Sequence, residues 1–225
     1  LEQYKIMPKK NNKNFWNKFY KNKLAVNKPS NFAIFVNNFL KKKKTKIVDV
    51  GCGNGRDLIF FKRKKFDFIG IDLSNNASQL IKKKPKKTED KNKIFNDDFV
   101  KFNYKKKIKN KFSIYSRFTW HTINKKNESL FINKISNLSN LEYLFIETRS
   151  IKDDLFGKGK KISKYEFITD HYRRFINKKE LIKKLKKKFK IIYLKEKKGF
   201  SKFKKEDPCL IRLIALKKST KILKS

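Results

Sequence analysis

The chain has 225 residues, a length that suits one α/β domain with a small addition. Hydrophobic residues make up 38% of it and aromatic residues 14%, so a sizeable core is available and the high charge does not indicate disorder. The N-terminus has no apolar run typical of a signal peptide, and no stretch approaches the roughly 20 apolar residues of a membrane span. We therefore expect a cytoplasmic protein.

The net charge is +42, from 62 Lys and Arg against 20 Asp and Glu. Two interpretations stay open: a bias of the coding sequence toward Lys and Asn, or binding to nucleic acid or another polyanion. A nucleic-acid footprint concentrates its charge on one face, and a sequence does not show faces. The two Cys and two His lack the spacing of metal ligands or of a disulfide framework, so we predict no metal site.

We expect residues 1–45 to form a helical segment over the ligand site, with a short amphipathic stretch near 15–20 and a helix that starts at Pro29-Ser30. From residue 46 onward, strands and helices alternate. Strands are expected at 47–50, 66–73, 93–96, 112–117 and 143–148, and helices at 56–64, 75–83 and 128–139. This order predicts an α/β fold with a Rossmann-like, doubly wound and mostly parallel sheet.

The last third of the chain departs from this alternation. Residues 149–177 are rich in charge, and we interpret them as a cap inserted over the carboxyl ends of the strands, where open α/β sheets bind ligands. A helix near 178–188 is followed by strands at 191–194 and 209–216 with no helix between them. We therefore predict a seven-stranded sheet with an antiparallel terminal strand over residues 46–218, and a tail at 219–225.

Three of the seven Gly lie within five residues, at Gly51, Gly53 and Gly55, directly after a predicted strand. Gly permits positive φ and a close approach of a ligand to the main chain. The last Gly of the dinucleotide fingerprint is replaced by Arg56 and no G-K-[ST] follows, so a pyrophosphate cradle is disfavoured. Helix-start N–H groups would instead favour a ligand carboxylate, and Asp49 would favour cationic groups.

A second anchor is Asp72, which ends the strand after the glycine loop and lies 21 residues beyond Gly51. An acid at about this spacing hydrogen-bonds ribose hydroxyls in Rossmann-type sites. Capping of the following helix is a compatible role. Asp97, Asp98 and Phe99 follow the third predicted strand, and an ordinary Asx turn is an equal interpretation of them.

The run Asp49-Val50-Gly51-Cys52-Gly53-Asn54-Gly55 resembles motif I of class I S-adenosylmethionine (SAM)-dependent methyltransferases. The resemblance covers residues 46–148 and implies SAM as the cofactor. It also implies that Asp72 binds the ribose, that Asp97 or Asp98 contacts the adenine amino group, and that Phe99 packs on the ring. The implied cofactor residues are Asp49, Gly51, Cys52, Gly53, Gly55, Asp57, Asp72, Leu73, Asp97, Asp98 and Phe99.

Four of the seven Arg, and both His, fall in segments predicted to surround the acceptor: Arg117, Arg149, Arg173, Arg174, His121 and His171. A guanidinium is a planar fork for phosphate or carboxylate, so we interpret Arg117, Arg149 and Arg173 as residues that orient an anion. His171 or His121 is the candidate general base. Alternatively, the Arg pair with Glu147, Asp170 or the acidic run 153–154, and the His only pack or cap loops.

Segments 115–121, 147–150 and 169–175 are also similar to small bacterial methyltransferases found with surface-glycan biosynthesis genes. This resemblance implies O-methylation of a sugar or small anionic metabolite. The DPPY motif of amino-methylating DNA enzymes is absent, which counts against adenine-N6 or glutamine methylation. An RNA methyltransferase, suggested by the charge, and a non-catalytic polyanion-binding protein with this fold remain the alternatives.

Overall fold

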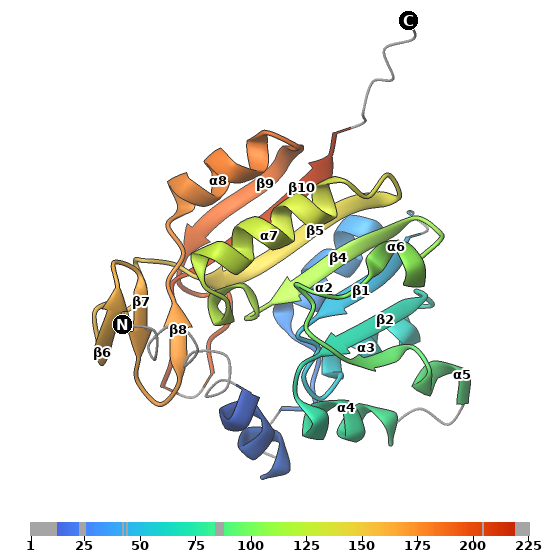
Figure 1. Ribbon diagram of the computed structural model, residues 1–225, viewed down its shortest axis with the longest axis horizontal. Coiled ribbons are helices and arrows are strands. Elements are labelled where there is room, and N and C mark those ends of the chain that lie inside the picture. Colours follow the sequence, from blue (N-terminus) through green and yellow to red (C-terminus); the bar gives the residue numbers. More distant parts are fainter. Residues whose placement is uncertain are drawn as a thin grey trace, which may run out of the picture.

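The computed structural model describes residues 13–22, 26–41, 43, 45–83, 88–203 and 205–218. Its centre is a seven-stranded sheet in the order β3-β2-β1-β4-β5-β10-β9 (Figure 1). The first five strands run parallel, and β10 runs antiparallel to both β5 and β9. The strands are β1 (Lys46–Val50), β2 (Phe68–Asp72), β3 (Ile94–Asn96), β4 (Phe112–Arg117), β5 (Leu141–Arg149), β9 (Phe189–Lys197) and β10 (Leu210–Lys217).

The predicted Rossmann-like, mostly parallel sheet is confirmed. The antiparallel strand is the last one in the chain, but within the sheet it lies between β5 and β9 rather than at the edge. Because strands of the parallel part are covered on both faces, they are apolar along nearly their whole length, and this is the signal that made them predictable.

The helices are α2 (Asn31–Leu40), α3 (Arg56–Arg63), α4 (Asn75–Lys82), α5 (Thr88–Lys91), α6 (Tyr104–Lys107), α7 (Lys125–Ser136) and α8 (Lys178–Lys186). Side chains of the N-caps Ser30, Ser74, Asn124 and Asn177 each accept a hydrogen bond from a backbone N–H of the first turn. The Asn124 cap starts α7 three residues earlier than predicted. Sequence periodicity missed α5 and α6, which have only four residues each.

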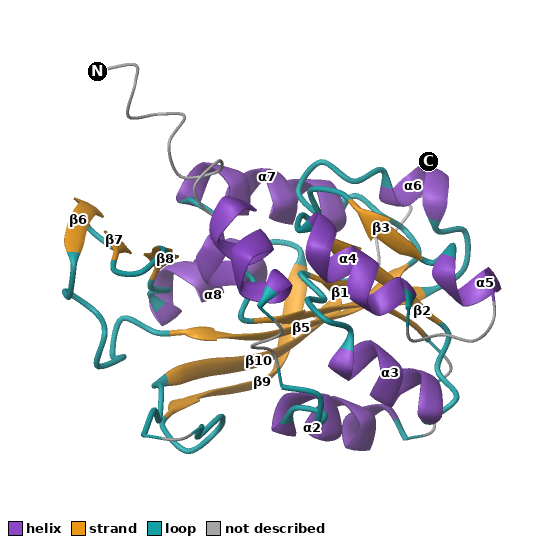
Figure 2. Ribbon diagram, turned by 90° about the horizontal axis from the view of Figure 1, so that it is seen from below, coloured by secondary structure: helices purple, strands orange, loops and turns teal. Residues whose placement is uncertain are grey.

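Two layers of helices enclose the sheet, with α2 and α3 on one face and α7 and α8 on the other (Figure 2). On the first face, Phe32 and Phe61 pack with Tyr115 of β4. On the second face, Phe131 and Leu185 belong to the larger core cluster. None of the described helices has the length and apolar character needed to cross a membrane.

Two small parts lie at one end of the main sheet (Figure 1). Strands β6 (Lys160–Ser163), β7 (Glu166–Ile168) and β8 (Tyr172–Arg174) form an antiparallel sheet inside the insertion predicted at 149–177. A helix over residues 13–21 touches it, because the rings of Phe15 and His171 stack at 4.3 Å between centroids. The predicted tail, 219–225, lies outside the described residues.

Candidate active site

A cavity of about 560 Å³ lies where the parallel strands end, the position at which open α/β sheets bind ligands. Its volume falls within the roughly 300–1,000 Å³ of small-molecule sites. Its walls come from helix 13–21, from residues 26–31, from the ends of β1, β2, β4 and β5, and from the connection between β9 and β10.

The glycine loop forms the floor of the cavity beside β1. Gly51 and Gly53 have φ of 71° and 55°, in the left-handed region that side chains disfavour. A Cβ atom on Gly51 would lie 2.3 Å from Oγ1 of Thr119, which donates a hydrogen bond to the carbonyl of Val50 at 2.8 Å. Gly55 caps α3 and does not line the cavity. A Cβ atom on Gly53 would lie 2.3 Å from the hydroxyl of Tyr20, so both glycines leave room for side chains that pack against the loop.

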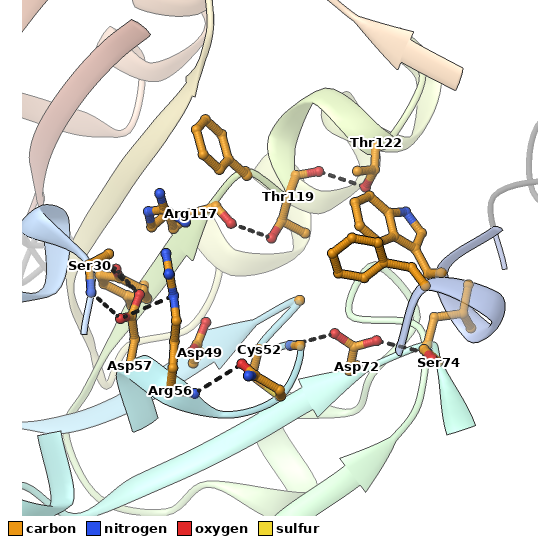
Figure 3. A pocket seen from close by; sticks show the side chains of 18 of the residues that line it. Ser30, Asp49, Cys52, Arg56, Asp57, Asp72, Ser74, Arg117, Thr119 and Thr122 are labelled. Carbon is orange, nitrogen blue, oxygen red and sulfur yellow. Dashed lines mark hydrogen bonds and ion pairs between the residues drawn. The ribbon is translucent and has the colours of Figure 1, made fainter. Parts of the chain in front are cut away.

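Asp72 ends β2 with both carboxylate oxygens held by backbone donors. The N–H of Gly53 donates to Oδ2 and the N–H of Ser74 to Oδ1, each at 2.8 Å (Figure 3). Burial raises the pKa of Asp72 to about 6, although these two hydrogen bonds oppose the rise. Each oxygen keeps a further lone pair with which to accept a hydroxyl of a ribose.

Asp49, at the end of β1, is a buried carboxylate that lines the cavity. No described residue donates a hydrogen bond to it. Burial and the nearby carboxylates of Asp57 and Asp72 raise its pKa well above the usual range. An isolated buried acid of this kind is stabilised by a cationic ligand.

The predicted adenine residues are divided by the structure. Asp98 and Phe99 line the cavity, as does Leu73. Asp97 does not, and its carboxylate accepts a hydrogen bond from the N–H of Asp98 at 2.7 Å. Of the two acids, Asp98 is therefore the one that lines the cavity.

Asp57 lines the cavity, but its carboxylate is engaged by α2 and β4. Oδ1 accepts a hydrogen bond from the N–H of Ser30 at 2.8 Å, and Oδ2 accepts one from Ser30 Oγ at 2.8 Å and one from the hydroxyl of Tyr115 at 2.7 Å. Ser30 Oγ in turn accepts the N–H of Ala33 and caps α2. The geometry thus makes Asp57 an anchor for residues 29–31, which form part of the cavity wall (Figure 3).

Arg117 and Arg149 both line the cavity, and each also meets carboxylates. Nε of Arg117 lies 3.2 Å from Glu147, which also pairs with Arg212 at 2.5 Å. Arg149 donates two hydrogen bonds to Asp153, at 2.9 and 3.1 Å, and its Nη2 lies 3.0 Å from an exposed Glu206 carboxylate. Arg117 therefore forms an ion pair with Glu147, and Arg149 forms one with Asp153, as the alternative interpretation predicted. Both Arg residues also line the cavity.

His121 lies on the turn Trp120–Thr122 and is buried. Its neighbour Thr122 lines the cavity, whereas the imidazole does not. Burial, with a smaller effect of the Arg149 charge, lowers the pKa of His121 well below its usual range, so the ring is neutral at pH 7.

His171 lies in the cap beside Tyr172, which lines the cavity, but its own ring is stacked on Phe15 and is not part of the wall. Its Nδ1 lies 3.0 Å from the Asp170 carboxylate. Burial, with a smaller effect of the Arg173 charge, lowers the pKa of His171 to about 4. Arg173 pairs with Asp170 at 2.5 Å and is likewise absent from the cavity wall.

Phe118 is a wall residue that sequence reasoning did not single out. Its φ is 55°, a left-handed conformation that costs a non-glycine residue roughly 1–2 kcal/mol. The guanidinium carbon of Arg117 lies 4.3 Å from the centre of its ring. Backbone strain of this kind concentrates at functional sites, so Phe118 is a candidate part of the acceptor wall.

Other wall residues also escaped prediction: Trp16, Tyr20, Ser30, Arg56, Ser201 and Glu206. One signal was available, because Arg is rare in this Lys-rich chain, and the argument that singled out Arg117 applies equally to Arg56. Trp16, Tyr20 and Ser30 lie in the helical segment predicted for the first 45 residues, but no role in the site was assigned to them individually. Ser201 and Glu206 carried no local pattern. Ser201 and Glu206 reach the cavity only because β10 inserts beside β5.

Solved structures that are similar to this chain include SAM-dependent methyltransferases. One from Methanosarcina mazei superposes with a TM-score of 0.68 at 18% identity, covering 83% of this chain and 98% of that one. Another, from Clostridium acetobutylicum, gives 0.61 at 15% identity, covering 84% and 92%. The glycopeptide N-methyltransferase MtfA, complexed with S-adenosyl-L-homocysteine (SAH), gives 0.62 at 10% identity, covering 85% and 90%.

Over residues 27–190 the sequence matches a family described as a methyltransferase domain. This match spans more than half of the 225 residues, and the chain therefore belongs to the methyltransferase-domain family. No curated protein sequence matches it.

The donor set of the cavity fits SAM. The Asp72 oxygens suit a ribose diol, the loop at Gly51 and Gly53 lines the cavity beside them, and the unpartnered Asp49 carboxylate suits a cation. SAM carries a ribose, a sulfonium and an ammonium, so the residues present agree with the cofactor that the glycine-loop motif implied.

Proposed function

We propose that this methyltransferase transfers the methyl group of SAM to an oxygen of a small anionic acceptor, such as a sugar in glycan biosynthesis. One observation carries the proposal: besides the predicted cofactor residues, the wall of the cavity includes the cationic side chains of Arg117, Arg149 and Lys202. Guanidinium groups suit phosphate and carboxylate, and the small volume suits a metabolite or the end of a glycan.

The cofactor would be held by Asp72 at its ribose, by Asp98 and Phe99 at its adenine, and by the loop at Gly51–Gly53 along its length. Bound SAM supplies a methyl group already activated by the sulfonium. The task left to the protein is to align an acceptor oxygen with that group and to exclude water. Arg117 and Arg149 would fix the anionic end of the acceptor, and Phe118 would form the wall between them.

A hydroxyl acceptor must lose its proton as the new bond forms, and His171 and His121 remain our candidate bases. The lowered pKa of each keeps the ring neutral at pH 7, which is the form that accepts a proton. Each adjoins a wall residue, Tyr172 or Thr122, so a side-chain movement would be needed to reach the acceptor. Arg173, which pairs with Asp170 in the cap, would act with Arg117 and Arg149 only after a similar movement.

A glycan-linked acceptor is supported by the resemblance of segments 115–121, 147–150 and 169–175, and by the fold shared with a methyltransferase that acts on a glycopeptide. The competing RNA acceptor is supported only by the net charge of +42. RNA binding that is driven by this positive charge would weaken steeply with added salt.

The test is methyl transfer from labelled SAM to nucleotide-linked sugars, sugar phosphates and RNA, with products resolved by mass spectrometry. We expect methylated sugar and none with RNA; transfer to RNA alone would refute the proposed acceptor. His171→Ala and His121→Ala should show which imidazole matters, because loss of the base lowers turnover far more than SAH affinity. Wild-type turnover in both variants would remove the base assignment.

A further inference from the structure

The Arg side chains around the cavity differ in how fully nearby carboxylates compensate their charges. Arg149 donates two hydrogen bonds to Asp153, which pairs with no other described cation, and a third to Glu206. Arg117 and Arg212, in contrast, share the single buried carboxylate of Glu147. This group of two guanidiniums and one carboxylate therefore keeps one positive charge, and Arg117 is its member on the cavity wall.

Arg56 adds a second incompletely compensated charge at the same place. It begins α3, lines the cavity and extends toward Arg117 (Figure 3). Its nearest carboxylate, Asp57, is 3.8 Å away and already accepts three hydrogen bonds from Ser30 and Tyr115. Within the described part of the chain, no side chain or carbonyl accepts a hydrogen bond from the Arg56 guanidinium.

Two guanidiniums that face one another, with only 19% and 15% of their side chains exposed, repel each other in a poorly solvated space. Burial and the Arg117 charge accordingly lower the pKa of Arg56. Arg117 donates from Nε to Glu147 and from Nη2 to Ser201 Oγ, and its other N–H groups have no acceptor among the described residues. A ligand oxyanion between the two guanidiniums relieves their repulsion and accepts hydrogen bonds from these N–H groups and from Arg56. The unpartnered acid Asp49 lies close enough for both Arg charges to act on its pKa.

We propose that Arg56 and Arg117 form a carboxylate-binding site for the methionine end of SAM, with Asp49 facing the ammonium on the same carbon. An amino-acid end carries both charges side by side, and the cavity presents two cations and one unpartnered acid in the same region. An acceptor anion would match the two Arg but would leave Asp49 without a partner. The inference rests on the SAM site of the proposed function and assigns Arg117 to the cofactor, which leaves Arg149 and Lys202 as the cationic wall residues for the acceptor anion.

Calorimetry with two ligands tests this site. SAH keeps the amino-acid end, whereas 5′-methylthioadenosine lacks it and keeps the adenosine. Loss of one charge-assisted hydrogen bond should weaken SAH binding to Arg56→Gln by about 10- to 100-fold, with little change for methylthioadenosine. Arg56→Lys, which keeps the charge, should lose less.

Arg63→Gln is the matched control, because Arg63 lies exposed on the same helix and its loss changes the net charge equally. Its affinity for SAH should equal that of the wild type. Unchanged SAH affinity in Arg56→Gln, or equal losses for both ligands, would overturn the carboxylate site while leaving the cofactor assignment intact. Failure of the wild type to bind either ligand would overturn both.

Discussion

Replacing Asp57 by Ala tests whether this residue anchors residues 29–31 of the cavity wall or contacts the cofactor directly. The carboxylate is 5% exposed and accepts three hydrogen bonds, two from Ser30 and one from Tyr115, at 2.7–2.8 Å. Ser30 Oγ and the Tyr115 hydroxyl lie 3.1 Å apart and can still pair, so the Ser30 N–H is the group left without a partner. We expect a loss of about 3–5 kcal/mol in the free energy of unfolding, from roughly 1.5–3 kcal/mol for hydrogen bonding to a charged group and roughly 1–3 kcal/mol for a buried N–H without a partner.

Urea denaturation without cofactor, followed by Trp fluorescence, measures this loss, and calorimetry with SAH measures binding. Asp57→Asn keeps one acceptor oxygen and should lose less, about 1.5–3 kcal/mol. Asp67→Ala is the control: this acid is half exposed and pairs with Lys46 and Lys93, so about 0–1 kcal/mol should be lost. A stable Asp57→Ala protein that has lost SAH affinity would show that Asp57 contacts the cofactor directly and would refute the anchoring argument.

Three further predictions follow from the cavity wall. Asp72 protonates as the pH falls through about 6, and a protonated acid accepts ribose hydroxyls poorly, so SAH affinity measured by calorimetry should fall below about pH 6 in the wild type but not in Asp72→Asn. Gly51→Ala combines a positive φ with a Cβ placed 2.3 Å from Thr119, so thermal unfolding should show a loss of roughly 1–3 kcal/mol together with weaker SAH binding. Glu147→Gln leaves two guanidiniums without their shared carboxylate and should lower stability to urea by about 3–5 kcal/mol; a loss below about 1 kcal/mol would contradict the charge-sharing argument.

The central strands β1, β2, β4 and β5 were predictable because most of their residues are buried, and β1 and β2 also end in the glycine loop and in Asp72. The cap sheet was not, since β6 is Lys-rich and exposed along its whole length and shows no alternation. Only the interruption of the strand–helix rhythm marked the insertion. Helices α5 and α6 were also missed, because each has only four residues, too few to show the 3.6-residue hydrophobic period of a helix.

The roles of individual site residues were harder to predict because their partners are distant in sequence. Asp57 looks like a cofactor residue by its place in the loop, yet it bonds to Ser30, 27 positions earlier. Arg149 meets Glu206, 57 positions later. Sequence placed both His in segments beside the cavity, but whether an imidazole faces the cavity or a neighbouring ring depends on packing that no local pattern records.

A crystal structure of the chain grown with SAH would examine cofactor binding most directly. We predict density for the adenosine at the end of β2, with ribose hydroxyls within hydrogen-bonding distance of Asp72 and the homocysteine above Gly51 and Gly53. SAH bound elsewhere, or a cavity still filled by the chain's own side chains at saturating SAH, would contradict the assignment of this protein as a SAM-dependent enzyme.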